Sequence, residues 1–392
     1  MYPNLYYAVK DLFGWEIPGL RFINSFGFFV AIAFLAAAWI LTLELKRKGR
    51  QGLLHYEETK ITVGEPASFG ELLMNFVTGF ILGYKILGAF IIGPADPQNF
   101  IFSAEGSWPA GIGLGLFFAG LKWYEKNKQK LAKPEERIIR IWPHDRVGDF
   151  VVLAAIFGFG GAKIFHNLEN WSEFIADPLT ALLSFSGLTF YGGLICAAIA
   201  ILWYARKHKI SMRHLCDATA PALMLAYAVG RIGCQVSGDG DWGIVSDKPK
   251  PFGFLPNWMW SFRFPHNVIN AGEPIPGCTG QYCNELPEGV YPTAFYETMV
   301  CLLLFGLLWY FRKRIDIPGR IFALYLIFNG VERFFIEKIR VNTKYDIFGF
   351  HPTQAEIISS LLVISGIILW VWMGKMPRPN EPKTAGPSPA FT

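Results

Sequence analysis

The stretch "YAVGRIGCQVSGDGDWG", residues 227–243, changes character halfway along its length. It begins as the end of an apolar run, contains Arg231, and continues into glycines and the acidic residues Asp239 and Asp241. An ionisable side chain within an apolar membrane segment is costly, so it is a functional candidate by default. Two questions follow: whether this segment spans a membrane, and which group Arg231 binds.

The composition of the 392 residues is typical of a membrane protein. Hydrophobic residues make up 52% of the chain and charged residues 17%, whereas soluble domains carry about 25% charge. No signal peptide is expected, because polar residues precede the first apolar run. We predict an all-α polytopic membrane protein with a small extracytoplasmic head domain. Apolar runs of about 20 residues predict nine transmembrane helices, at 24–45, 70–93, 109–124, 148–165, 186–205, 215–236, 295–311, 321–338 and 352–374.

The distribution of positive charge predicts the orientation. Of the 36 lysines and arginines, 24 lie in one set of connecting segments and 8 in the opposite set. Cytoplasmic loops carry the excess of positive charge, so we expect a cytoplasmic C-terminus and a periplasmic N-terminus. The asymmetry suits a bacterial inner membrane, and no nucleic-acid partner is expected.

Two stretches of the chain resemble each other. The segment 68–87 matches 146–165, with Gly83 and Lys85 recurring as Gly161 and Lys163. The following spans also match, so a two-span hairpin is duplicated in the same orientation. We expect the following divisions: 1–67 with the first span, 68–145 as the duplicated hairpin, 146–236 as core spans, 237–294 as the periplasmic head, 295–374 as the C-terminal core, and 375–392 as a disordered cytoplasmic tail.

Arg231 and Arg333 lie near the same end of their predicted spans. Two arginines at one depth can grip a phosphate through bidentate hydrogen bonds. Glu337 and Arg340 follow Arg333 by four and seven residues and so share its helical face. The alternative is Arg–Glu pairing or snorkelling to the headgroups, which we favour for Lys338 and Arg340.

The six cysteines divide into two groups. Cys278 and Cys283 lie in the large outer segment, where an oxidising environment favours a disulfide; their spacing also fits half of a metal site, although no second Cys/His pair accompanies it. The other four lie in or beside spans, and small apolar packing residues are the expected role; they are Cys196, Cys216, Cys234 and Cys301.

Four motifs in order, "GRIGCQVSGDGDWG", "YPTAFYET", "RFFIEKIR" and "HPTQAEIIS", resemble bacterial prolipoprotein diacylglyceryl transferases. The resemblance covers the first span and most of 146–374, so we expect residues 68–145 to be an insertion relative to the family. It implies transfer of the diacylglyceryl group of phosphatidylglycerol to a lipobox cysteine of a prolipoprotein, forming a thioether. It implies no metal and no cofactor. The expected partners are phosphatidylglycerol, the lipobox peptide and membrane lipids.

The resemblance also implies roles for individual residues. The expected catalytic residues are Arg231 of the glycine–arginine signature, the second arginine Arg333, Glu337 one turn on, Asp239 where a glutamate is usual, and Tyr191. The expected substrate-binding residues are Gly192, Gly193, Tyr296, Glu297, Asn329 and Gln354.

Several positions depart from the family pattern. Tyr191 replaces a histidine proposed as a base, and a nearby arginine would favour its phenolate. Cys234 replaces an asparagine, Asn329 and Phe26 replace tyrosines, and the "GDGDWG" segment is one residue longer than usual. A diverged transferase is the favoured interpretation. The alternatives are a non-catalytic relative that binds phospholipid or scaffolds a membrane complex, and a small-molecule transporter.

Overall fold

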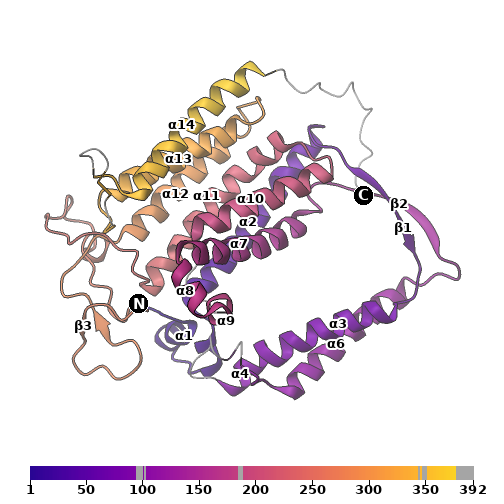
Figure 1. Cartoon of the computed structure of the whole chain (residues 1–392), viewed down its shortest axis with the longest axis horizontal. Coiled ribbons are helices and arrows are strands. Elements are labelled where there is room, and N and C mark those ends of the chain that lie inside the picture. The colour runs from indigo at the N-terminus through magenta and orange to yellow at the C-terminus, as the bar shows by residue number, and fades with distance from the viewer. Residues whose placement is uncertain (94–99, 101–102, 184–188, 343–344, 347–350, 377–392) are drawn as a thin grey trace.

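The computed structural model in Figure 1 describes residues 1–93, 100, 103–183, 189–342, 345–346 and 351–376. In this part of the chain a long helix occupies each of the nine predicted ranges. These helices are α2 (Ser25–Arg50), α3 (Phe69–Ile81) continued by the π-helical turn η2 (Leu82–Leu87) and α4 (Gly88–Ile92), α6 (Trp108–Lys128), α7 (Val147–Glu169), α10 (Phe190–Lys207), α11 (Met212–Ser237), α12 (Thr293–Phe311), α13 (Arg320–Glu337) and α14 (Gln354–Lys375).

Five of these helices are long and apolar enough to cross a membrane by themselves: α2, α3 with its continuation to Ile92, α7, α12 and α14. The chain is therefore a multi-pass membrane protein. The helices that carry Arg231 and Arg333 are not among the five. Both pack within the bundle, α11 against α2, α12 and α13, and α13 also against α14, so their charges face protein.

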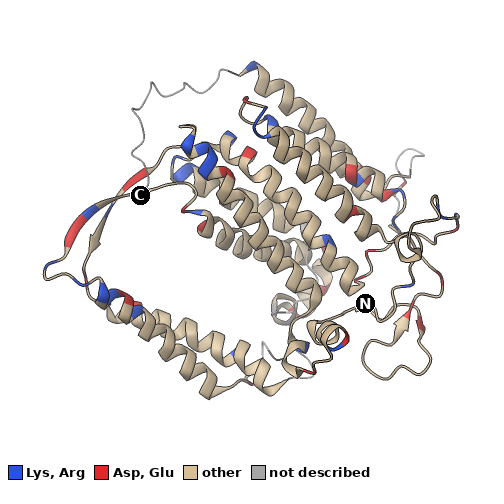
Figure 2. Ribbon diagram, turned by 180° about the vertical axis from the view of Figure 1, so that it is seen from behind, with Lys and Arg blue, Asp and Glu red and all other residues tan. Residues whose placement is uncertain are grey.

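The bundle has two distinct ends. We call the end that carries residues 238–292 the head end, and the end beside strands β1 (Glu57–Val63) and β2 (Glu135–Ile141) the ribbon end. Figure 2 shows lysines and arginines gathered at the ribbon end. The apolar core there joins α2 to α11 through residues such as Leu45 and Leu215, and a second cluster joins α11 to α12 through Met224 and Leu308.

Buried ion pairs close the ribbon end. Glu44 is 1% exposed and accepts hydrogen bonds from Arg47 at 2.5 Å and from Arg312 at 2.5 Å. Asp217 accepts the backbone N–H groups of Gly319 at 2.8 Å and Phe322 at 3.0 Å. These bonds satisfy orphan donors at the start of α13, so the charges at this end hold helices together.

The two hairpins, α3/α6 and α7/α10, are built alike. A Cβ on Gly83 would lie 2.3 Å from the carbonyl oxygen of Ala110, and one on Gly161 would lie 2.6 Å from that of Gly192. Matched glycines therefore allow the same close helix approach in both hairpins. The lysines at matched positions are Lys85 and Lys163. Lys85 donates to the carbonyls of residues 100, 103 and 105 beyond its helix, and Lys163 is 5% exposed and lines a small cavity below α8 (Trp171–Ala176).

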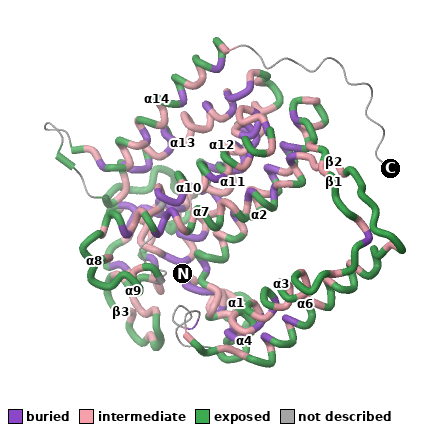
Figure 3. Tube along the Cα trace, turned by 45° about the vertical axis from the view of Figure 1, so that its right-hand side comes forward, coloured by how far each residue is buried: buried purple, intermediate pink, exposed green. Residues whose placement is uncertain are grey.

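The α3/α6 hairpin lies apart from the bundle (Figure 1) and is largely exposed along its length (Figure 3). At one end, α4 packs on the short helix η1 (Pro18–Phe22). At the other end, β1 and β2 pair antiparallel from Glu57↔Ile141 to Val63↔Glu135. The ribbon was not predicted, because each strand finds its partner only across the intervening hairpin.

Short elements cover the head end. Phe264, Leu286 and Val290 form a small apolar cluster. The remaining described elements are α1 (Leu5–Phe13), α9 (Pro178–Leu183), η3 (Asn257–Met259), β3 (Glu273–Pro274) and β4 (Asn284–Glu285). Cys278 and Cys283 are joined as a disulfide in this segment. The tail expected to be disordered, 375–392, lies outside the described residues from 377 onward.

Candidate functional site

A tight turn follows α11 and folds the chain back over the end of the helix. Gly238 (φ 65°) and Gly240 (φ 100°) both adopt the left-handed conformation that glycine enters without steric cost. The turn brings Asp241 back onto Arg231, with which it forms an ion pair. Thr293 donates to the backbone carbonyl of Asp241 at 2.8 Å and anchors the turn on α12.

Glu297 on α12 is the centre of the site. Its side chain is fully buried and contacts three guanidinium groups. Arg231 approaches through Nε, Arg333 through Nη1 at 3.0 Å, and Arg340 through Nη1 at 3.3 Å. A carboxylate between three arginines offsets their mutual repulsion in a medium of low polarity.

Two further carboxylates complete the cluster. Arg340 bonds Asp241 at 2.5 Å, and Arg333 bonds Glu337 at 3.2 Å one helical turn away. The six residues Arg231, Arg333, Arg340, Asp241, Glu297 and Glu337 are called the arginine cluster below. Their formal charges cancel.

The arginine cluster refines the expectation from sequence. Arg231 and Arg333 do converge on one anion, but in this structure the anion is the carboxylate of Glu297. Arg340, for which pairing or snorkelling was expected, is paired and only 9% exposed, so it does not snorkel. Lys338 instead pairs with Glu356 at 2.5 Å, and its side chain is 55% exposed.

The two aspartates after α11 have different environments. Burial alone would raise the pKa of Asp241, but Arg231 and Arg340 outweigh that effect and hold the pKa below its usual value. Burial raises the pKa of Asp239 above its usual value. Of these two aspartates, Asp241 is the one that pairs with Arg231. Asp239, which the family pattern singled out, lies beside Cys234.

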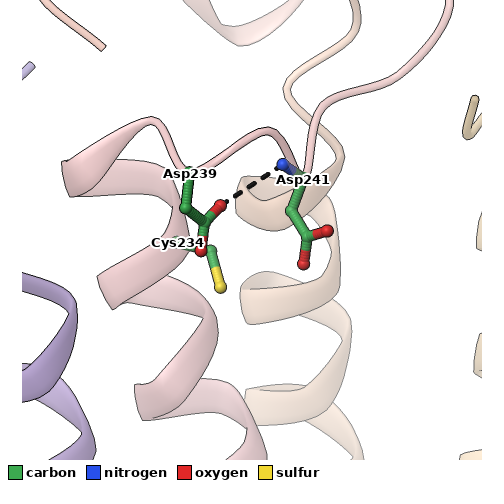
Figure 4. A group of neighbouring side chains, drawn as sticks. All are labelled: Cys234, Asp239 and Asp241. Atoms are coloured by element: carbon green, nitrogen blue, oxygen red, sulfur yellow. Dashed lines mark hydrogen bonds between the residues drawn. The ribbon is translucent and has the colours of Figure 1, made fainter. Parts of the chain in front are cut away.

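Figure 4 shows Cys234, Asp239 and Asp241 together, with the Asp241 backbone N–H donating to Asp239 at 3.3 Å. Their ligand atoms lie within 4.8 Å of one another, and such donors could hold a metal ion. Arg231 donates to the sulfur of Cys234 at 3.7 Å and pairs with Asp241. The guanidinium thus supplies positive charge to this group, and the absence of a metal stays a prediction.

Several polar atoms of the site lack a hydrogen-bond partner within the described residues. They are Glu297 Oε2, Glu337 Oε2 and Arg340 Nε. Glu297 Oε2 and Glu337 Oε2 are in ionic contact with arginines but are not aligned as hydrogen-bond acceptors. Glu332 is 5% exposed and interacts electrostatically with Glu297 and Arg333. Sequence reasoning missed Glu332, although it directly precedes Arg333.

The other predicted residues lie around the arginine cluster. Tyr191 interacts electrostatically with both Arg333 and Glu337, so it meets charges of both signs rather than the cation alone. Asn329 lies one turn before Arg333 on α13. Tyr296 points elsewhere, because its hydroxyl donates to the carbonyl of Met259 at 2.7 Å.

Three predicted substrate-binding residues, Gly192, Gly193 and Gln354, have other surroundings. A Cβ on Gly192 would lie 2.4 Å from Phe165, and one on Gly193 would lie 2.7 Å from the carbonyl oxygen of Gly158. Both glycines therefore allow α10 to pack on α7. Gln354 is exposed in the first turn of α14. Phe26, at a position expected to be tyrosine, is 40% exposed on α2.

Fold and site together define a multi-pass membrane protein with a buried cluster of arginines and carboxylates at one end of its bundle. Residues 109–372 match the family model described as prolipoprotein diacylglyceryl transferase. The chain belongs to this family. The matched range begins inside the α3/α6 hairpin, so the assignment of 68–145 as the inserted copy stays a prediction.

Curated relatives agree with the family match. Three similar proteins carry the name phosphatidylglycerol–prolipoprotein diacylglyceryl transferase. One from Corynebacterium efficiens is 30% identical over 232 residues, 58% of this chain and 68% of the relative. One from Vibrio vulnificus is 30% identical over 237 residues, 60% and 77% of the two chains. One from Staphylococcus haemolyticus is 28% identical over 313 residues, 79% and 95% of the two chains.

Proposed function

We propose that this protein transfers the diacylglyceryl group of phosphatidylglycerol to the lipobox cysteine of a prolipoprotein. The observation that carries the proposal is the convergence of Arg231 and Arg333 on one anion position in a chain of this family. Such fixed cations stabilise negative charge as it develops on a leaving phosphate. Binding of phosphatidylglycerol and of the lipobox peptide belongs to the proposal.

The reaction joins the acceptor sulfur to the glycerol carbon that carries the phosphate. A thiolate attacks this carbon, a carbon–sulfur bond forms, and the carbon–oxygen bond breaks. The bonding electrons leave with glycerol phosphate, next to the guanidinium groups. The thiol proton passes to a base, for which Asp239 and Tyr191 are the candidates. The raised pKa of Asp239 makes its carboxylate a better proton acceptor than an ordinary aspartate.

The phosphate needs N–H groups that now bind carboxylates. Asp241 is the carboxylate that is easiest to displace, because its side chain is 32% exposed whereas those of Glu297 and Glu337 are fully buried. We propose that the lipid phosphate replaces Asp241 on Arg231 and Arg340, while Glu297 keeps the arginines in place. A non-catalytic lipid-binding protein is the second candidate, and the replacement of the family's histidine by Tyr191 favours it.

The membrane topology belongs to the same proposal. Nine helices span a bacterial inner membrane, with the ribbon end in the cytoplasm and the head end in the periplasm. The excess of lysine and arginine at the ribbon end supports this orientation. A C-terminal fluorescent-protein fusion should fluoresce, and loss of fluorescence with activity of a C-terminal alkaline phosphatase fusion would reverse the orientation.

A transfer assay decides between the two functions. Purified protein is incubated with phosphatidylglycerol and a lipobox peptide, and the thioether product and glycerol phosphate are measured by mass spectrometry. The proposal expects both products in equal amounts, and complementation of a strain that lacks its own transferase. Lipid binding without either product, together with failure to complement, would favour the non-catalytic protein.

A further inference from the structure

A second cavity lies at the head end, apart from the arginine cluster. Its volume is about 590 Å³, within the range of small-ligand sites. Three parts of the chain form it: the first residues up to Asp11, the end of α11, and the outer segment between Trp258 and Cys283. None of the six residues of the arginine cluster lines it.

Phenylalanine, tyrosine and tryptophan make up a third of the residues that line this cavity. Tyr7 and Tyr282 meet edge to face at 6.0 Å, and the Cys278–Cys283 disulfide closes the loop that carries Tyr282. No lysine or arginine is among the lining residues, and the acidic side chain at the wall is Asp11. Met1 also lines the cavity, and its N-terminal amino group already donates to the carbonyl of Pro265 at 2.9 Å. These walls suit a neutral, partly apolar ligand and disfavour the phosphate of a lipid headgroup.

The wall of the cavity contains a side chain with an unsatisfied hydrogen-bond acceptor. Gln235 lines the cavity, and its Oε1 atom is buried without a hydrogen-bond partner among the described residues. An unsatisfied buried acceptor costs free energy until a donor reaches it. The backbone N–H of a polypeptide is such a donor, whereas the acyl chains of a lipid have none.

The cavity is also placed along the path of the acceptor. Gln235 follows Arg231 by four residues on α11, so both lie on the same helical face, about 6 Å apart along the axis. An extended chain covers about 3.3–3.6 Å per residue. A peptide whose cysteine lies at Arg231 would therefore reach Gln235 with its second or third following residue.

We infer that the cavity formed by the N-terminal segment, the end of α11 and the disulfide loop binds the residues that follow the acceptor cysteine of the prolipoprotein. The inference rests on the proposed transfer reaction. It adds a peptide subsite, separate from the phosphate-binding arginines, that holds the chain after the acceptor cysteine.

Kinetics with two acceptor peptides test the inference. The long peptide carries six residues after the cysteine, and the short peptide ends at the cysteine as an amide. We expect Gln235→Leu and Trp258→Ala each to raise KM for the long peptide about tenfold, equivalent to about 1.4 kcal/mol, with kcat unchanged. KM for the short peptide should stay the same, because that peptide does not enter the cavity. Phe254→Ala is the matched control, since Phe254 is 82% exposed in the same outer segment and does not line the cavity.

The possible results separate this inference from the proposed function. Equal changes of KM for both peptides, or no change for either, would overturn the subsite. If the wild-type protein forms no product with either peptide, the transfer reaction is rejected and the subsite is tested by binding alone. A long peptide with a photoreactive benzophenone at its third residue after the cysteine should then crosslink to residues 278–283. Crosslinking elsewhere, or displacement by phosphatidylglycerol vesicles, would overturn it.

Discussion

At the ribbon end, Glu44 lies between Arg47 and Arg312 with good hydrogen bonds to both. At the head end, Glu297 lies between three arginines, and one of its oxygens has ionic contact without an aligned hydrogen bond. Both carboxylates are almost fully buried, so burial alone does not separate a structural ion pair from a functional one. Both ends contain buried polar atoms without a hydrogen-bond partner among the described residues, Arg312 Nε at the ribbon end and Arg340 Nε at the head end. The difference lies in the carboxylates: both oxygens of Glu44 accept aligned hydrogen bonds, whereas Glu297 Oε2 does not.

The largest expected effect comes from removing the central carboxylate. Glu297→Gln leaves three guanidinium groups close together, and breaking a buried ion pair costs about 3–5 kcal/mol. We expect a large fall in thermal stability in detergent and no measurable transfer. Glu44→Gln should lower stability by a similar amount, yet its folded fraction should retain transfer. Equal specific activity of the two variants would remove the distinction between the two ends.

Replacing an arginine by lysine keeps the charge but loses the bidentate geometry. Arg231→Lys should lower kcat about 10²–10³-fold, the usual cost of losing one donor that stabilises developing charge. The matched change at the ribbon end, Arg47→Lys, should leave kcat within about twofold. A similar fall for both would show that the arginines act through stability alone.

The pH dependence of transfer tests Asp239. A base must be ionised, so activity should fall as the pH drops through the raised pKa of this carboxyl group. The acid limb of the kcat/KM profile should therefore lie above the ordinary aspartate range. Asp239→Asn should remove that limb and lower kcat about 10²-fold. If the limb persists unchanged in Asp239→Asn, another group accepts the proton and Tyr191→Phe is the next variant.

The disulfide is expected to matter for the head end alone. A loop this short contributes about 2 kcal/mol in the chain-entropy treatment. Cys278→Ser should lower the thermal midpoint modestly and should raise KM for long acceptor peptides without changing kcat. Alkylation of both thiols in the wild-type protein without reductant, read by mass spectrometry, would contradict the bond.

The smallest effect is expected at Glu332. Burial of a carboxylate is unfavourable, and Glu332, which is 5% exposed, also lies near the like charge of Glu297. Glu332→Gln should leave stability unchanged or raise it by less than about 1 kcal/mol, with transfer intact. Loss of transfer at full stability would instead give Glu332 a part in proton movement.

The sequence predicts the helices well because each is marked by its own apolar run. The predicted end of the first span, residue 45, falls short because α2 continues through a charged stretch to Arg50. Contacts between distant segments are a different matter. The pairing of β1 with β2 depends on a register that no local pattern encodes. The pairing of Arg231 with Asp241 instead of Asp239 depends on the turn after α11, which no local pattern encodes either.

The site was predicted only in part for a similar reason. Helical spacing places Arg333 and Glu337 on one face, and the structure pairs them. Helical spacing does not predict that Glu297, on another helix, lies between Arg333 and Arg231. It also does not predict that Arg340, beyond the end of α13, contacts Asp241. The family resemblance supplied Arg231, Arg333, Glu297 and Glu337, whereas Asp241 and Arg340 join the cluster only through the packing of the folded chain.

The register of the ribbon has a consequence for the history of the chain. Because Glu57 lies opposite Ile141, the chain leaves and re-enters the remainder of the protein at neighbouring points. The segment between these two points begins and ends at the same place, so a tight turn could join the chain on either side if the segment were removed. A gene could therefore have gained, and could again lose, this entire lobe in one recombination event without disturbing the order of any other helix.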